Sequence, residues 1–293
     1  MGTLRAVTPS AYIDLHSADL LARLQRLVGI STVNPPGENY DAITAELTRD
    51  LTAVGLRARR FTIPRALLRQ TLPPAQHAFP RYNVLGKLAA PGTKKTLHFN
   101  AHYDVVPVSG NWRHGSPFSG AVEAGWIYGR GTADMKGFIA CCLRAGEMAA
   151  QRKLHTPINL AFSYDEEIGC MGVRSLVDML QSAPVRPRFC IVGEPTGMQV
   201  ATGHKGKVAL RAICTGREGH SALAPMALNA LHLAADFVQA VRALQADVAA
   251  KGLKDGDYDV PYSTIHVGKL NGGVQVNIVP NTAVIDFEIR SVA

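Results

Sequence analysis

The chain has 293 residues, of which 47% are hydrophobic and 18% are charged. This share of apolar residues is enough to bury a core, so the composition excludes an intrinsically disordered protein. The longest apolar stretches, such as residues 137–143, are far shorter than the roughly 20 residues that cross a bilayer. The first residues lack the apolar segment of a signal peptide. We therefore expect neither a membrane-spanning nor a secreted nor a fibrous protein.

Lysine and arginine outnumber aspartate and glutamate by 31 to 23, which gives a formal net charge of +8. A basic excess can indicate binding to nucleic acid or to anionic substrates. The one local arginine cluster, within residues 57–69, lacks an interleaved aromatic platform, so a solvated surface explains it better and nucleic-acid binding rests on charge alone. The five cysteines lack metal-knuckle spacing, and we expect reduced, mostly buried thiols in a cytoplasmic protein.

The first two hundred residues alternate between helical and strand periodicity. Ser17 is a candidate cap for a helix with leucines at helical spacing, and the segment 34–37 (NPPG) breaks this helix. A second helix carries Ile43 to Val54 on one face and stops at Gly55. Further on, strands are expected at 82–88, 96–101, 158–163 and 189–192, and helices at 136–150 and 172–181. Strands that alternate with helices predict an α/β domain with a mostly parallel sheet.

The pattern changes after Gly203. Strands are expected at 207–214, 263–267 and 283–290, with one long amphipathic helix at 227–244 between the first two. Strands with one solvated face and a helix on the other face predict a smaller α+β domain. We place the boundary at 203–206, which gives a first domain of residues 1–203 and a second of residues 204–293.

Acidic and histidine side chains follow the expected strands. His102 and Asp104 end one strand, and because residues two apart point to the same side, the carboxylate can receive a ring N–H of the imidazole. Taken alone, this pair is better explained by a structural histidine. A glycine-flanked turn then delivers Asp134 at the entry of a helix, where an N-cap is the simpler alternative.

Two further strand ends carry acids. Asp165, Glu166 and Glu167 follow the strand 158–163, and Glu194 follows the strand 189–192. A solvated acidic loop is the alternative at residues 165–167. However, the carboxyl ends of strands are where α/β sheets place their sites. An oxygen-rich ligand set with one imidazole suits a pair of Zn²⁺, Co²⁺ or Mn²⁺ ions.

These motifs together resemble the M20 metallopeptidase family, the group of acetylornithine deacetylases, succinyl-diaminopimelate desuccinylases and aminoacylases. The resemblance continues through residues 203–206, 219–222 and 272–280, and residues 165–174 and 192–206 are most similar to bacterial acetylornithine deacetylases. It implies a zinc-exopeptidase-like catalytic domain with a mostly parallel sheet flanked by helices. It also implies a smaller inserted α+β domain for dimerisation or as a lid.

The resemblance also implies roles for individual residues. One metal would be held by His102, Asp134 and Glu194, and a second by Asp134, as the bridging ligand, and Glu167. Glu166 would be the general base, and Asp104 would orient His102. In the smaller domain, His220 would act in the partner's active site across a dimer, and Asn277 and Arg290 would hold substrate.

The implied activity is that of a metal-dependent amidohydrolase in the cytoplasm, acting in arginine biosynthesis. It would remove an acyl group, such as acetyl, from an N-acyl amino acid such as N-acetylornithine, through a metal-bridged hydroxide and the Glu166 base. Two Zn²⁺ ions would complete the site, with Co²⁺ or Mn²⁺ as alternatives, and a homodimer would form through the smaller domain.

One departure from the family affects this expectation. Family members add a final histidine ligand from a segment beyond the smaller domain, whereas this chain stops at residue 293. We therefore expect a C-terminally truncated member whose catalytic domain lacks its closing part. A desuccinylase, a dipeptidase-like hydrolase of the same family and an inactive relative remain as alternatives.

Overall fold

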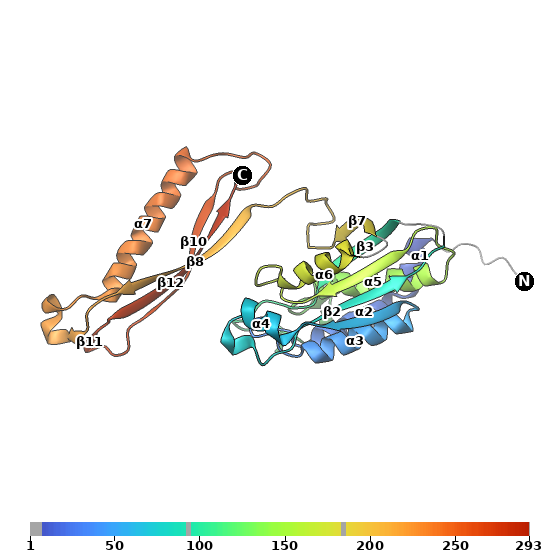
Figure 1. Ribbon diagram of the computed structural model, residues 1–293, viewed down its shortest axis with the longest axis horizontal. Coiled ribbons are helices and arrows are strands. Elements are labelled where there is room, and N and C mark those ends of the chain that lie inside the picture. The colour runs from blue at the N-terminus through green and yellow to red at the C-terminus, as the bar shows by residue number, and fades with distance from the viewer. Residues whose placement is uncertain (1–7, 92–94, 183–185, 293) are drawn as a thin grey trace, which may run out of the picture. The chain divides into compact units, whose positions relative to one another are not determined.

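The computed structural model describes residues 8–91, 95–182 and 186–292. The chain divides between Gln199 and Val200 into two compact units, and most of their helices and longer strands are labelled in Figure 1. The first unit contains the helices α1 (Pro9–Leu15), α2 (Ser17–Gly29), α3 (Tyr40–Ala53), α4 (Arg65–Thr71), α5 (Lys136–Ala150) and α6 (Met171–Gln181), and the short 3-10 helix η1 (Pro74–Gln76). Its strands are β1 (Arg57–Thr62), β2 (Tyr82–Leu88), β3 (Lys95–His102), β4 (Ala121–Glu123), β5 (Trp126–Tyr128), β6 (Ile158–Ser163) and β7 (Arg186–Val192).

The central sheet of the first unit has the strand order β1-β2-β6-β3-β7. The pairs β6–β3 and β3–β7 are parallel, whereas β1–β2 and β2–β6 are antiparallel. The α/β class is confirmed, and the parallel strands are those that alternate with helices in the sequence. The antiparallel strand β1 was not expected, because three of its six residues are arginines and it lacks apolar alternation.

The arginine cluster of residues 57–69 is in part built into this strand. Arg60 donates to Asp41 at 3.0 Å and lies over the Tyr82 ring at 4.4 Å. Arg59 lies over the Phe61 ring at 4.5 Å, so aromatic residues do accompany this cluster, contrary to expectation. These contacts engage the guanidinium groups of Arg59 and Arg60 with other residues of the same unit.

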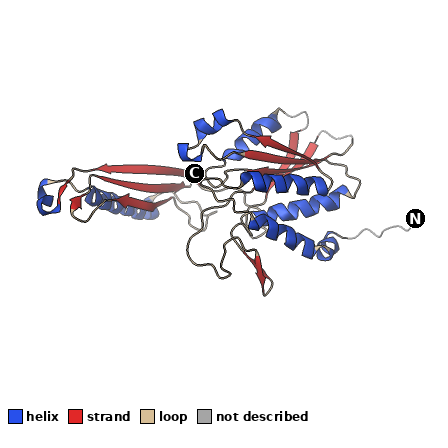
Figure 2. Cartoon of the chain, turned by 90° about the horizontal axis from the view of Figure 1, so that it is seen from below, coloured by secondary structure: helices blue, strands red, loops and turns tan. Residues whose placement is uncertain are grey.

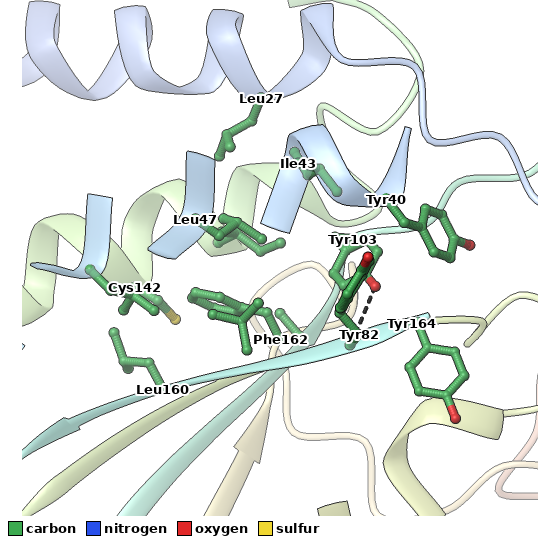
Figure 3. Packing of buried hydrophobic residues seen from close by; sticks show 14 of the residues in the cluster. Leu27, Tyr40, Ile43, Leu47, Tyr82, Tyr103, Cys142, Leu160, Phe162 and Tyr164 are labelled. Atoms are coloured by element: carbon green, nitrogen blue, oxygen red, sulfur yellow. Dashed lines mark hydrogen bonds between the residues drawn. The ribbon is translucent and has the colours of Figure 1, made fainter. Parts of the chain in front are cut away.

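Helices cover both faces of the sheet (Figure 2). On one face, leucine and isoleucine side chains of α3 and α5 pack on Leu160 and Phe162 of β6 (Figure 3). Tyr103, which follows β3, donates from its hydroxyl to the Tyr82 carbonyl at 2.7 Å inside this core. On the other face, the Asn83 amide donates to the Gly172 carbonyl of α6 at 3.1 Å. Because alternate residues of β2 serve the two faces, both sides of the strand are covered.

The N-cap of helix α2 lies one residue earlier than expected. Its N-cap is His16, and Ser17 is already helical, with its hydroxyl donating to the Asp14 carbonyl at 3.1 Å. Helix α1 ends at Leu15, and the single residue His16 serves as both its C-cap and the N-cap of α2.

The second unit is an antiparallel sheet of order β10-β12-β8 with one long helix (Figure 2). Its elements are β8 (Gly206–Thr215), β9 (Gly219–His220), η2 (Ser221–Met226), α7 (Ala230–Lys251), β10 (Thr264–Gly272), β11 (Ile278–Val279) and β12 (Thr282–Ser291). Ala230, Ala234 and Phe237 of α7 pack on Ala283 and Ile285 of β12.

Helix α7 starts later than the expected residue 227. Asn229 is its N-cap, with the side chain accepting from Leu231 N at 2.8 Å, and the 3-10 segment η2 precedes it. Asparagine is among the strongest N-cap residues, which explains this start. Within the described residues, no helix is both long and apolar enough to cross a membrane.

All five cysteines lie in the described part of the chain and are free thiols. Cys142 is buried in the core, where burial raises the pKa of its thiol to about 12. Cys141, Cys170 and Cys190 are exposed, so the expectation of mostly buried thiols is wrong. Cys141 is exposed on α5. Cys190 lies on β7, an edge strand that pairs only with β3 among the described strands.

Candidate active site

The candidate site lies where the parallel strands end. Because β6, β3 and β7 run in the same direction, their carboxyl ends meet at one edge of the sheet. His102 is the last residue of β3, the acids of residues 165–167 follow β6, and Glu194 follows β7. Asp134 joins them from the loop that enters α5, where its peptide bond to Met135 is cis.

The imidazole of His102 lies at the centre of these acids. Its Nε2 atom is 3.0 Å from Asp134 Oδ1, 3.7 Å from Glu194 Oε1 and 3.9 Å from Glu166 Oε2. Its Nδ1 atom donates to the backbone carbonyl of Asp104 at 3.0 Å. Since a carbonyl oxygen only accepts, Nδ1 is protonated, and Nε2 is the nitrogen that faces the acids.

Three of these residues form a group with ligand geometry. One ligand atom each of His102, Asp134 and Glu167 lies within 4.8 Å of the others. Glu194, expected beside His102 and Asp134, is close to the imidazole but falls outside this mutual distance. One imidazole nitrogen with carboxylate oxygens is a donor set that fits Zn²⁺, Co²⁺ or Mn²⁺.

The electrostatics of the site show how crowded the acids are. Burial, and then the neighbouring Asp134, raise the pKa of Glu167 to about 7. Burial also raises the pKa of Glu194, whereas the hydrogen bond from His102 lowers the pKa of Asp134. Burial lowers the pKa of His102, but hydrogen bonds with Asp104 and Asp134 outweigh it and raise this pKa to about 11. Acids that disfavour each other's charge in this way are stabilised by a cation.

Asp104 makes different contacts from those expected. Its carboxylate is 3.4 Å from His102 Nδ1, so its backbone carbonyl makes the closer contact with the ring. The carboxylate instead accepts the backbone N–H groups of Glu166 at 3.1 Å and Glu167 at 3.2 Å. It also accepts the Asn34 amide at 3.1 Å. Asp104 therefore connects the end of β3 to the acidic loop after β6.

The sequence did not single out Asp165 and Arg81 as a pair. Both side chains are fully buried, and Arg81 Nε donates to Asp165 Oδ2 at 2.7 Å. Tyr40 and Asn34 donate to the other carboxylate oxygen at 2.8 and 3.0 Å. Residues 34–37 were expected only to break a helix. No local pattern indicated that Asn34 and Tyr40 bind Asp165, more than 100 positions away.

Lys136 is a second buried cation that the sequence did not single out. Its Nζ atom donates to the carbonyls of Leu27 at 3.0 Å and Ile30 at 2.7 Å, at the end of α2. Burial lowers the pKa of this amine to about 7. A cation at the carboxyl end of a helix satisfies carbonyls that lack a helical partner. Lys136 thereby fixes the start of α5, two residues after Asp134.

The remaining three expected site residues belong to the second unit. His220 pairs with Ile278 between β9 and β11, and the N–H of Ser221 donates to the Asn277 carbonyl at 3.0 Å. His220 and Asn277 therefore lie at the same end of this unit. Arg290 is paired with Glu288 at 3.0 Å, near the other end of β12. The eight residue-to-residue steps from Thr282 to Arg290 span about 26 Å of strand, which separates Arg290 from that end.

The helix-flanked α/β sheet, with a histidine and several acids at its carboxyl edge, indicates a protein of the metallohydrolase class. Comparison with known families agrees: residues 98–277 match the model of Peptidase family M20/M25/M40, and the chain belongs to this family.

Curated relatives are named acetylornithine deacetylase. One from Myxococcus xanthus is 33% identical over 199 residues, which cover 68% of this chain and 50% of the relative. One from Yersinia pseudotuberculosis is 31% identical over 222 residues, which cover 75% and 56%. The chain thus spans about half the length of the curated relatives it matches. Among solved structures, an M20 family metallo-carboxypeptidase from Sulfolobus solfataricus matches with a TM-score of 0.69 at 21% identity, covering 94% of this chain and 71% of that one.

Proposed function

We propose that the protein is a metal-dependent amidohydrolase that removes an acyl group, in particular acetyl, from an N-acyl amino acid such as N-acetylornithine. The observation that carries this proposal is the convergence of His102, Asp134 and Glu167 at the carboxyl edge of the sheet. The relatives named acetylornithine deacetylase support the acyl group and the amino acid. We place this reaction in cytoplasmic arginine biosynthesis.

The metal-binding residues are assigned on the chemistry of their donor atoms. His102, Asp134 and Glu194 would hold one divalent cation, and Asp134 and Glu167 would contribute ligands to a second. We propose Zn²⁺, with Co²⁺ or Mn²⁺ as alternatives that accept the same donors. A bound cation of this kind polarises an amide carbonyl and lowers the pKa of a water molecule.

Glu166 is the general base in this proposal. Its carboxylate lies 3.9 Å from His102 Nε2, on the side of the ring that faces the acids, and it is partly exposed to solvent. From this place it takes a proton from the attacking water and then delivers it to the leaving amine. Asp104 acts through its hydrogen bonds to the N–H groups of Glu166 and Glu167, which orient the loop.

Residues of the second unit complete the proposal. His220 and Asn277 act as neighbours, with His220 stabilising the oxyanion and Asn277 holding substrate in the active site of a partner subunit. Arg290, at the other end of β12, holds a separate part of the substrate. The second unit is the proposed dimerisation domain, and its edge strand β8 offers unpaired backbone groups to a second copy.

A substrate panel tests the function. Zn²⁺- or Co²⁺-loaded protein is assayed with N-acetyl-L-ornithine, N-succinyl-diaminopimelate and an unblocked dipeptide. We expect hydrolysis of the acetylated substrate above the other two, abolished by chelation and by His102→Ala. Preference for the succinylated substrate or the dipeptide would assign another specificity within the family, and no hydrolysis of any of them would contradict the proposal.

A further inference from the structure

Arg81 is buried and binds Asp165, the residue next to the proposed base. Its side chain is 0% exposed, and all three guanidinium nitrogens donate hydrogen bonds. The partners are Asp165 Oδ2 (2.7 Å), the carbonyls of Phe79 (3.0 Å) and Pro36 (2.8 Å), and Gln76 Oε1 (3.2 Å). The planar fork of arginine makes such a multidentate arrangement, which lysine does not reproduce.

The segment 34–40 is shaped around this guanidinium. Gly37 has a φ of +91°, and a Cβ atom at this position would lie 2.6 Å from the guanidinium carbon of Arg81. The Tyr40 ring lies under the same group, with its centroid 4.9 Å from that carbon. Helix α2 already ends at Gly29, so the NPPG segment (34–37) does not break it. The segment instead provides a close-fitting cradle for Arg81, and glycine is the residue that fits there.

Hydrogen bonds continue from Arg81 to the acidic loop. Asp165, which is 0% exposed and has a φ of +51°, accepts Arg81 on one oxygen and Tyr40 and Asn34 on the other. The same Asn34 amide group donates to Asp104 Oδ2. Asp104 in turn accepts the N–H groups of Glu166 and Glu167. Both ends of the dipeptide Asp165–Glu166 are thus held by one connected set of buried groups.

We propose that Arg81 is a positioning residue for the candidate metal site. Through Asp165 and the Asn34–Asp104 bridge, Arg81 sets the backbone of the acidic loop so that the Glu167 carboxylate joins His102 and Asp134, with the Glu166 carboxylate beside the imidazole. This inference rests on the proposed function for the identity of what is positioned. Changes to groups that orient metal ligands weaken metal affinity by about 10- to 100-fold.

The test compares three variants with the wild-type chain. Arg81→Met removes the guanidinium and leaves the Asp165 carboxylate buried without its counter-charge. In the double variant Arg81→Met/Asp165→Asn that charge is removed as well, and asparagine tolerates the positive φ. Arg144→Met is the matched control, because Arg144 is also buried, at 3% exposure, and donates to Glu147 at 2.6 Å within α5.

Three measurements are made on each chain. Co²⁺ alone is titrated, following its visible absorption and the heat of binding. Hydrogen exchange of residues 164–170 is followed in the metal-free chain, and thermal melting measures the stability of each variant. The exchange measurement reports the order of the loop directly, whatever the metal affinity of the wild-type chain.

We expect the double variant to fold, to bind Co²⁺ about 10- to 100-fold more weakly with an altered spectrum, and to exchange the Glu166 and Glu167 amides faster. Arg144→Met should lower the melting temperature and change neither readout. Co²⁺ affinity and exchange equal to the wild type in the double variant would overturn the proposal. If the wild-type chain binds no Co²⁺, the proposed function fails. Hydrogen exchange then tests the positioning role by itself, and unchanged protection of the loop in the double variant would overturn the role of Arg81.

Discussion

The backbone N–H of Glu167 donates to the Asp104 carboxylate at 3.2 Å, so two strand ends that carry proposed metal ligands are joined by one buried acid. The carbonyl of the same Asp104 holds Nδ1 of His102 at 3.0 Å. One residue therefore sets both the imidazole and the acidic loop, from the end of β3. The positions of both His102 and Glu167 therefore depend on Asp104.

Asp104→Ala should consequently weaken metal binding without removing a ligand. The loop loses the acceptor of two N–H groups and the imidazole loses a nearby carboxylate, so we expect about 10- to 100-fold weaker Zn²⁺ affinity. Competition with a chromophoric chelator measures it. An affinity within twofold of the wild type would show that the loop and the ring are positioned without this carboxylate.

Glu166→Ala should separate metal binding from turnover. Glu166 is the proposed base rather than a ligand, so the metal content should stay close to that of the wild type. The rate of amide hydrolysis in the active protein should fall by about 10²- to 10⁴-fold, as is typical when a general base is lost. His102→Ala and Glu194→Ala are the comparison variants, and each should lose metal affinity. Wild-type turnover by Glu166→Ala would remove the base assignment.

The site residues differ in how far the sequence could predict them. His102, Asp134, Glu166, Glu167 and Glu194 follow strands or a glycine-flanked turn, so the rule that strand ends carry sites was enough to single them out as candidates. No role was expected for Asp165, and a solvated loop was the alternative for it and its two neighbours, whereas its side chain is fully buried.

Arg81 and Lys136 were beyond the reach of local patterns. A buried cation looks in sequence like any surface cation, and its partners lie 84 residues away for Arg81 and 109 and 106 residues away for Lys136. The antiparallel strand β1 was missed for a similar reason, because its pairing with β2 is a tertiary contact that overrides its polar composition.

Gly37→Ala should strongly destabilise the first unit. An added Cβ would meet the Arg81 guanidinium at 2.6 Å and would also sit at a φ of +91°. Gly110→Ala is the matched control, since Gly110 has a φ of +74° but no atom within 4 Å of a built Cβ. The control should lose only the backbone term of about 1–2 kcal/mol, whereas Gly37→Ala should lose clearly more in urea unfolding. Equal losses would show that Arg81 moves away from position 37 without cost.

The stability of the fold should depend on pH through His98. This buried ring in β3 has an Nδ1 atom without a hydrogen-bond partner among the described residues, and burial lowers its pKa to about 4. At pH values between about 4 and 6.5, the unfolded chain therefore binds more protons at His98 than the folded chain does. Stability is therefore fully present above pH 6.5 and is lost as the pH falls toward 4, by about 3 kcal/mol in total.

Urea unfolding of the wild type and His98→Met between pH 4.5 and 7.5 measures this dependence. Both chains share the titration of the active-site acids, so the difference between them isolates His98. We expect the variant to lose less stability than the wild type on acidification. Parallel pH profiles would mean that His98 is protonated at the same pH in the folded and unfolded chains.

The central claim is that His102 and the surrounding acids form a metal site, and calorimetric titration with Zn²⁺ tests it most directly. The described residues contain one group with mutual ligand geometry, built on a single imidazole. The account predicts about one tightly bound Zn²⁺ per chain, retained in Glu166→Ala and lost in His102→Ala. The absence of tight binding in the wild type, or binding that His102→Ala leaves unchanged, would contradict it.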